Sequence, residues 1–177
     1  MPGLADPRFH KAVIFMCAHD ENGAMGLIVN HHLPNLDFPE LLQKMQMDDE
    51  VFEELQSLDM KIFSGGPVEN GRGFLLHDAD FSDKDTIRVT DELSVTGTLG
   101  ALQKIAKGQG PEHALFILGH AGWSKDQLER EIGEGSWLVS QPKSSIIFHQ
   151  QQDEVWDLAV RDMGVDPALL SHTSGHA

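Results

Sequence analysis

Basic side chains are scarce in this chain of 177 residues, which has 13 Lys and Arg against 28 Asp and Glu and a formal net charge of −15. The shortage runs through both halves, since residues 1–88 hold 7 basic and 16 acidic side chains and residues 89–177 hold 6 and 12. A protein that binds the phosphate backbone of nucleic acid needs a basic face to neutralise phosphates. The composition therefore argues against direct binding to DNA or RNA.

Cysteine and long apolar runs are also scarce. Cys17 is the single cysteine, so an internal disulfide is impossible, and it lies in the apolar run 12–18, where we expect a buried structural thiol. The longest apolar runs have six or seven residues, far short of the ~20 that a membrane-spanning helix needs. The N-terminal residues lack the basic and apolar regions of a signal peptide. We therefore expect a cytoplasmic protein without a membrane partner.

Complete catalytic and metal-binding motifs are missing as well. The ten histidines are accompanied by no Cys-x2-Cys or Glu-x2-His pair of the kind that indicates zinc. Gly71-Arg72-Gly73 begins like a dinucleotide-binding fingerprint, but Leu76 stands at the sixth position and a strand, not a helix, is expected there. We therefore expect a protein that is not an enzyme, with no catalytic residues, no metal and no cofactor.

The apolar patterns favour a single mixed α+β domain over residues 1–177. Two apolar runs flank Asn22-Gly23, a dipeptide typical of a tight hairpin turn. Hairpins of this kind stand where a doubly wound fold would have helical crossovers. The expected strands are 11–18, 24–30, 61–64, 73–77, 86–89, 93–96, 114–118, 136–140 and 145–148; the expected helices are 38–47, 50–58, 99–106, about 124–132 and 154–163. Residues 171–177 are small and polar, and we expect them to form a loose tail.

The segment 119–123, Gly-His-Ala-Gly-Trp, follows a continuous apolar strand and precedes a helix that Ser124 and Gln127 are spaced to cap. This placement resembles the nucleophile elbow of hydrolases, but Ala121 occupies the position of the nucleophile, so a hydrolase is rejected. A turn of small residues at this point would expose the N–H groups of a helix N-terminus to an anion. The alternative is that the glycines only let Trp123 and the helix pack tightly on the sheet.

Three other features are candidates for ligand contact. Gly65-Gly66-Pro67, between two expected strands, is either a turn or a backbone edge that a ligand approaches closely. Arg72 would bind a carboxylate or phosphate, or form an ordinary salt bridge. His77 and His120 would form an acid/base pair if their strands bring them together. The full set of candidate ligand-binding residues is Gly65, Gly66, Pro67, Arg72, His77, Gly119, His120, Gly122, Trp123 and Gln127.

A series of short motifs covers nearly the whole chain. It comprises Asp6-Pro7 with Phe9 and Val13, His19, residues 23–30 (Gly-Ala-Met-Gly-Leu-Ile-Val-Asn), Gly65-Gly66-Pro67-Val68, residues 73–77 (Gly-Phe-Leu-Leu-His), Gly119 with Ala121-Gly122-Trp123, Gln127-Leu128-Glu129 with Glu131, Trp137-Leu138, Phe148, Trp156 and Gly175-His176-Ala177. Together these motifs resemble the AlgH/YqgE family of bacterial proteins. Relatives usually carry an apolar segment before the position of Met1, so we expect this chain either to lack the family's N-terminal strand or to begin at a misassigned Met. Relatives also more often have Tyr in place of His120.

The resemblance implies an α+β fold with a complex mixed, mostly antiparallel sheet and a small barrel-like core surrounded by helices. It also implies a cytosolic protein of uncharacterised biochemistry, although some members are labelled transcriptional regulators. Our first hypothesis is a non-catalytic regulatory or binding module that contacts a protein or a small anionic ligand, with its oligomeric state left open. The alternatives are a small enzyme that uses a His acid/base on an anionic substrate, and a direct DNA-binding regulator, which the net charge of −15 disfavours.

Overall fold

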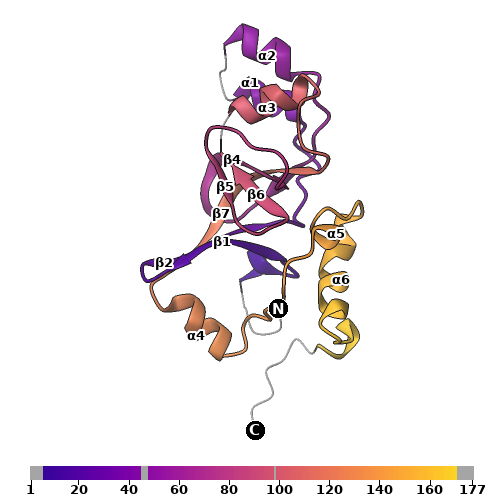
Figure 1. Ribbon diagram of the computed structural model, residues 1–177. Helices are drawn as coiled ribbons and strands as arrows, with labels where there is room; N and C mark the ends of the chain where they lie inside the picture. Colours follow the sequence, from indigo (N-terminus) through magenta and orange to yellow (C-terminus); the bar gives the residue numbers. More distant parts are fainter. Residues whose placement is uncertain (1–5, 45–47, 98, 171–177) are drawn as a thin grey trace.

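A computed structural model describes residues 6–44, 48–97 and 99–170 of the protein (Figure 1). Its sheet has seven strands: β1 (Ile14–Asp20), β2 (Gly23–Ile28), β3 (Ile62–Ser64), β4 (Val68–Asp78), β5 (Thr86–Arg88), β6 (Leu93–Thr96) and β7 (Ala114–Ser124). The α-helices are α1 (Phe38–Lys44), α2 (Asp49–Leu55), α3 (Leu99–Ala106), α4 (Gln127–Gly133), α5 (Ser144–Ile147) and α6 (Val155–Asp162). Short 3-10 helices cover Pro7–Phe9, Gln152–Glu154 and Pro167–Leu169.

The strands form one curled, half-barrel sheet in the order β1-β2-β7-β4-β6-β5. Each neighbouring pair in this order is antiparallel, whereas β3 pairs with β7 in parallel. One side of the sheet carries a central core that includes Phe15, Leu27, Phe74 and Ile117. This architecture confirms the α+β prediction of a mostly antiparallel sheet with helices around it.

Helices cover the sheet at two ends (Figure 1). The apolar faces of α1, α2 and α3 pack together at one end on side chains such as Phe116 and Leu118 of β7. At the other end, α4 and α6 lie on either side of β1 and β2. No helix among the described residues is both long and apolar enough to cross a membrane.

The hairpin is confirmed, but its turn lies one residue earlier than predicted, at Glu21-Asn22, because Asp20 of β1 pairs with Gly23 of β2. Gly23 has a φ of +144°, and a Cβ atom at this position would lie 2.2 Å from the carbonyl oxygen of Trp123. Only glycine therefore lets the hairpin close against β7.

Strand β7 is longer than predicted and changes its facing pattern at Gly119. Leu115 and Ile117 point into the central core, but beyond Gly119 it is the ring of His120 that contacts Phe74 of that core. Gly119 adopts a φ of +72°, and a bulge-like residue of this kind shifts the alternation of a strand. As a consequence, Trp123 faces α4 on the outer side of the sheet.

Three local predictions are wrong. The segment 119–123 is not a turn but the second half of β7, where it pairs with β2 and takes its backbone groups into the sheet. Residues 136–143 form no regular element, and Ser144–Ile147 is helix α5 rather than a strand. The β-branched pair Ile146-Ile147 suggested a strand, but Ile147 reaches the central core from one helical turn. The predicted tail 171–177 and the end of the predicted helix 38–47, residues 45–47, lie outside the described residues.

Candidate functional site

The predicted site residues fall into three separate places. The first is a junction where Gly65 and Gly66, between β3 and β4, press against β7. A Cβ atom on Gly65 would lie 2.2 Å from the carbonyl oxygen of Gly119, and one on Gly66 would lie 2.3 Å from the carbonyl carbon of His120. Backbone therefore fills the space that a ligand would need, and the glycines are required by the close approach of two chain segments. Pro67 leads from this contact into β4.

Arg72 and His120 lie beside the junction. The guanidinium of Arg72 bonds to Glu69 at 3.0 Å and lies 5.0 Å from the centre of the Phe74 ring. His120 meets the same ring edge-on, and its Nδ1 lies 3.7 Å from the Glu69 carboxylate. Arg72 therefore forms the salt bridge that was the alternative to an anion contact. Gly122, two residues along β7, borders Val68.

His77 lies near the C-terminal end of β4, far from His120 of β7. His77 pairs with Ala114 of β7, whereas His120 pairs with Val68. The six residue-to-residue steps from Ala114 to His120 span roughly 20 Å of strand. The two imidazoles do not share a cleft, so the predicted acid/base pair is wrong.

A directed chain of hydrogen bonds surrounds the fully buried His77. Nδ1 lies 2.8 Å from the carbonyl oxygen of Asp78, which only accepts, so Nδ1 carries the proton and Nε2 accepts from the Thr96 hydroxyl at 2.8 Å. Thr96 in turn accepts from Thr86, which accepts from the amide of Asp83. Burial lowers the pKa of His77, although Asp78 and Asp80 partly oppose this effect. The arrangement fits a neutral, structural imidazole.

Trp123 and Gln127 lie in a third place, where both side chains donate hydrogen bonds to the carboxylate of Glu131 in α4. The indole N–H groups of Trp123 and Trp137 donate to Oε2 of Glu131 at 2.9 and 2.7 Å, and the Gln127 amide donates to Oε1 at 2.8 Å. Burial raises the pKa of Glu131, but these hydrogen bonds from Trp137, Gln127 and Trp123 outweigh it and the pKa lies below its ordinary value. Glu131 is thus a charged anchor for two aromatic rings.

Gln127 also ties α4 to the end of β7, because its side-chain oxygen accepts from the Ser124 amide at 3.0 Å. The predicted helix start at Ser124 is wrong, because Ser124 is the last residue of β7, and Asp126 precedes the helix without a capping hydrogen bond from its side chain.

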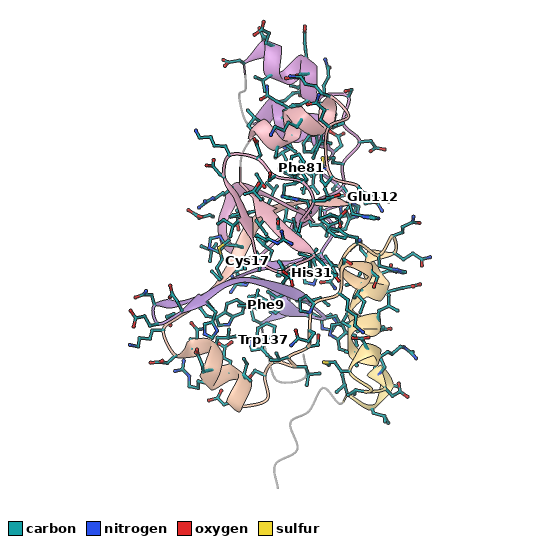
Figure 2. All side chains as sticks on the ribbon, viewed as in Figure 1. Phe9, Cys17, His31, Phe81, Glu112 and Trp137 are labelled. Atoms are coloured by element: carbon teal, nitrogen blue, oxygen red, sulfur yellow. The ribbon has the colours of Figure 1, made fainter. Side chains whose placement is uncertain are left out.

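A pocket of about 280 Å³ opens beside these rings, and we call it the tryptophan pocket. All three tryptophans of the chain line it: Trp123 from β7, Trp137 from the segment after α4, and Trp156 from α6. The outer side of β1 contributes Ile14 and Met16 as its floor. Figure 2 shows Trp137 beside Phe9 below β1, on the opposite side of that strand from Cys17.

The mouth of the tryptophan pocket is apolar. Ile132, Leu138 and Val139 line it and are 38%, 43% and 70% exposed. Among the described lining residues, His19 and Ser140 are the ones with a polar side chain other than tryptophan. His19 is already engaged, because its Nε2 lies 2.5 Å from the carboxylate of Glu129.

Some residues of this pocket were identified from the sequence, but not the hydrogen bonds and distant residues that form it. Trp123 and Gln127 were candidates, whereas Glu131 was named only as part of a family motif. The missed wall residues Trp137 and Trp156 stand 14 and 33 positions after Trp123, so no local spacing connects them. The available signal was the clustering of the chain's large aromatic residues in the motifs around α4 and α6.

One other prediction concerns Cys17. Its side chain is only partly buried, but desolvation raises the pKa of its thiol to about 12, which fits a structural rather than a reactive thiol. Within the ranges 6–44, 48–97 and 99–170, no group of three or more His, Cys, Asp or Glu side chains is placed to hold a metal ion.

The fold and the pocket define an α+β half-barrel protein with an aromatic-walled hollow on its outer face. The sequence profile of the family described as AlgH-like matches residues 1–168 of this chain. The chain therefore belongs to the AlgH-like family, and the predicted resemblance is confirmed.

Individual relatives agree with this assignment. The UPF0301 protein of Bradyrhizobium sp. is 42% identical over 181 residues, covering 100% of this chain and 84% of the relative. The UPF0301 protein of Paracoccus denitrificans is 43% identical over 180 residues, covering 100% of this chain and 93% of the relative.

Two solved structures share the fold. The solution structure of the AlgH protein from Pseudomonas aeruginosa matches with a TM-score of 0.77 and 35% identity, covering 100% of this chain and 92% of that one. A crystal structure of a protein from Corynebacterium diphtheriae matches with a TM-score of 0.72 at 20% identity, covering 98% and 87%. The second likeness shows the fold alone.

Proposed function

We propose that this protein is a non-catalytic binding module of the bacterial cytosol, and that it takes a small ligand in the tryptophan pocket as part of a regulatory function. The observation that carries the proposal is the pocket itself. It is concave, mainly apolar and bordered by few polar side chains, which is the usual character of a small-molecule site.

The walls of the pocket are held in place before any ligand arrives. Trp123 and Trp137 meet at 77° with ring centres 5.8 Å apart, and Phe9 supports Trp137 edge-on at 5.7 Å. The hydrogen bonds to Glu131 fix the outer edges of both indoles. A site with ordered walls loses little conformational freedom on binding, and this favours affinity.

The two alternatives receive less support. The hypothesis of an enzyme with a histidine acid/base pair has little support, because His77 is buried in its own chain of hydrogen bonds and His120 lies elsewhere on the sheet. A direct DNA-binding regulator would need a basic surface, whereas the net charge is −15. If the protein regulates transcription, we infer that it does so through another protein.

The proposal is tested by filling the pocket. Purified protein is dialysed against a small-molecule extract of the native bacterium, and retained compounds are identified by mass spectrometry. The filled variant is Ala159→Phe in the pocket wall, and its matched control is Ala168→Phe, an exposed position in the 3-10 helix Pro167–Leu169.

We expect the unmodified protein and the Ala168→Phe control to retain the same compound, and the Ala159→Phe variant to lose it. Retention of the same compound by all three proteins would place binding outside the pocket. Retention of no compound by any of them would contradict the proposed function.

A further inference from the structure

We infer that the ligand of the tryptophan pocket is an uncharged, largely apolar molecule with about the bulk of two fused rings and one polar edge. This inference rests on the function proposed above and adds the chemical class of the ligand. It replaces the anionic ligand that the sequence favoured.

The size of the pocket sets the bulk of the ligand. A dry apolar cavity of about 150 Å³ accommodates one benzene ring in a well-studied case. The tryptophan pocket, at about 280 Å³, has close to twice that volume. Flat aromatic walls at 77° to each other also suit a rigid ring system, which stacks on one indole and meets the other edge-on.

The charges around the pocket exclude an ionic ligand. Glu131 already accepts three hydrogen bonds, and His19 is paired with Glu129. Lys11 lies 4.8 Å from the centre of the Trp156 ring and 3.6 Å from the carboxylate of Asp157. Because each of these side chains already has a partner, an ion placed against the indoles would lose hydration without gaining a counter-charge. The net charge of −15 further repels anions.

The positions of the polar residues that line the pocket indicate where the polar edge of the ligand lies. His19 and Ser140 both line the pocket, and both residues are exposed. Ser140 forms no hydrogen bond with any other described residue. A hydroxyl or amide at the edge of the ligand would therefore bond to Ser140 or remain hydrated, while its rings contact Trp123, Trp137 and Met163.

Three naphthalene derivatives that differ in one substituent test this inference by isothermal titration calorimetry. They are 1-naphthalenemethanol, which is uncharged, 1-naphthalenesulfonate, an anion, and 1-naphthylmethylammonium, a cation. We expect the alcohol to bind one molecule per chain at least tenfold more tightly than either ion. The Ala159→Phe variant should weaken its binding at least tenfold, and the Ala168→Phe control should leave it unchanged.

A second filled variant, Ser140→Phe, tests the same placement if Ala159→Phe fails to fold. It should fold normally, because Ser140 is exposed and lies outside any regular element. Tighter binding of either ion, lost in both filled variants, would overturn the ligand class but leave the pocket as a binding site. Equal binding to the filled variants and the control would overturn the placement. If no derivative binds and the extract yields no retained compound, the proposed function fails together with the inference.

Discussion

At the scale of single residues, Glu131 illustrates how one carboxylate determines the shape of a site. Its Oε2 accepts from two indoles that come from different segments, one in β7 and one after α4. Two N–H donors bind an ionised carboxylate more strongly than a neutral acceptor, because charge-assisted hydrogen bonds are roughly twice as strong as neutral ones. The carboxylate therefore holds both ring planes at the pocket wall.

Replacing Glu131 by Gln tests this arrangement. The amide group would keep one acceptor oxygen but would place N–H groups against the Gln127 amide, so the buried Trp123 indole would lose its charged partner. We expect the free energy of unfolding to fall by about 1–3 kcal/mol. Chemical denaturation followed by far-UV circular dichroism measures it. Glu134→Gln, at an exposed position one residue past α4, should change it by less than about 0.5 kcal/mol.

His77 gives a second residue-scale prediction, which concerns pH. Its pKa is lowered in the folded state, so below its ordinary value of about 6.5 the unfolded chain binds more protons than the folded one. The contribution of His77 to stability is therefore fully present above that value and is lost as the pH falls. Denaturation midpoints measured between about pH 7.5 and 5.5 should decline toward acid.

The His77→Gln variant should show a shallower decline, since an amide can donate to Asp78 and accept from Thr96 without titrating. The exposed His32→Gln variant should follow the unmodified protein. Burial also lowers the pKa of His31, which accounts for a remaining slope. A His77→Gln slope equal to that of the unmodified protein would show that His77 charges freely in the folded state.

At the scale of elements, β7 connects the two halves of the sheet and depends on Gly119. A Cβ at Gly119 would lie 2.8 Å from the carbonyl oxygen of Gly66 and 2.9 Å from that of Val68. Its φ of +72° adds the cost of a left-handed conformation for any other residue. The register of the long strand, and with it the side to which Trp123 points, is therefore tied to one glycine.

Substitution of Gly119 by Ala should destabilise the protein by about 2–5 kcal/mol, from backbone strain and overpacking together. Gly71→Ala is the matched control, because nothing lies within 4 Å of a Cβ at that position. It should cost less than about 1 kcal/mol. Thermal denaturation compares the two variants, and similar losses in both would contradict the bulge assigned to Gly119.

Elements whose structure follows from the local sequence pattern were predicted, whereas elements whose structure depends on contacts with distant residues were not. The β1–β2 hairpin and the amphipathic helices were predicted because their signals are local. Residues 119–123 looked like a turn because four of the five are Gly, Ala or His, yet pairing with β2 makes them part of a strand. Residues 136–140 resembled a strand because Leu138 and Val139 are apolar, but both remain exposed at the mouth of the pocket.

At the scale of the whole molecule, the shortage of basic residues has a direct consequence for nucleic acid. Binding to a phosphate backbone depends on releasing counterions with Lys and Arg. A chain with net charge −15 should show no saturable binding to duplex DNA in a mobility-shift assay below about 10⁻⁴ M protein near 150 mM salt. Sequence-selective binding that weakens steeply with added salt would contradict this expectation.

The tryptophan pocket is likewise a property of the whole molecule. Its walls come from β1, β7, α6 and the segment after α4, and no local pattern joins residues so far apart in the sequence. Sequence motifs could mark Trp123, but only the folded chain shows that its indole shares the acceptor of Trp137.

The most direct test of the central claim uses the indole N–H signals of the three tryptophans in a ¹H–¹⁵N correlation spectrum, recorded while 1-naphthalenemethanol is added. All three side chains line one pocket, so we expect the signals of Trp123, Trp137 and Trp156 to shift together and saturate at one ligand per chain. The backbone signals of Arg72 and His120, at the glycine junction, should stay in place. Shifts at that junction with unmoved indole signals would contradict a ligand site in the tryptophan pocket.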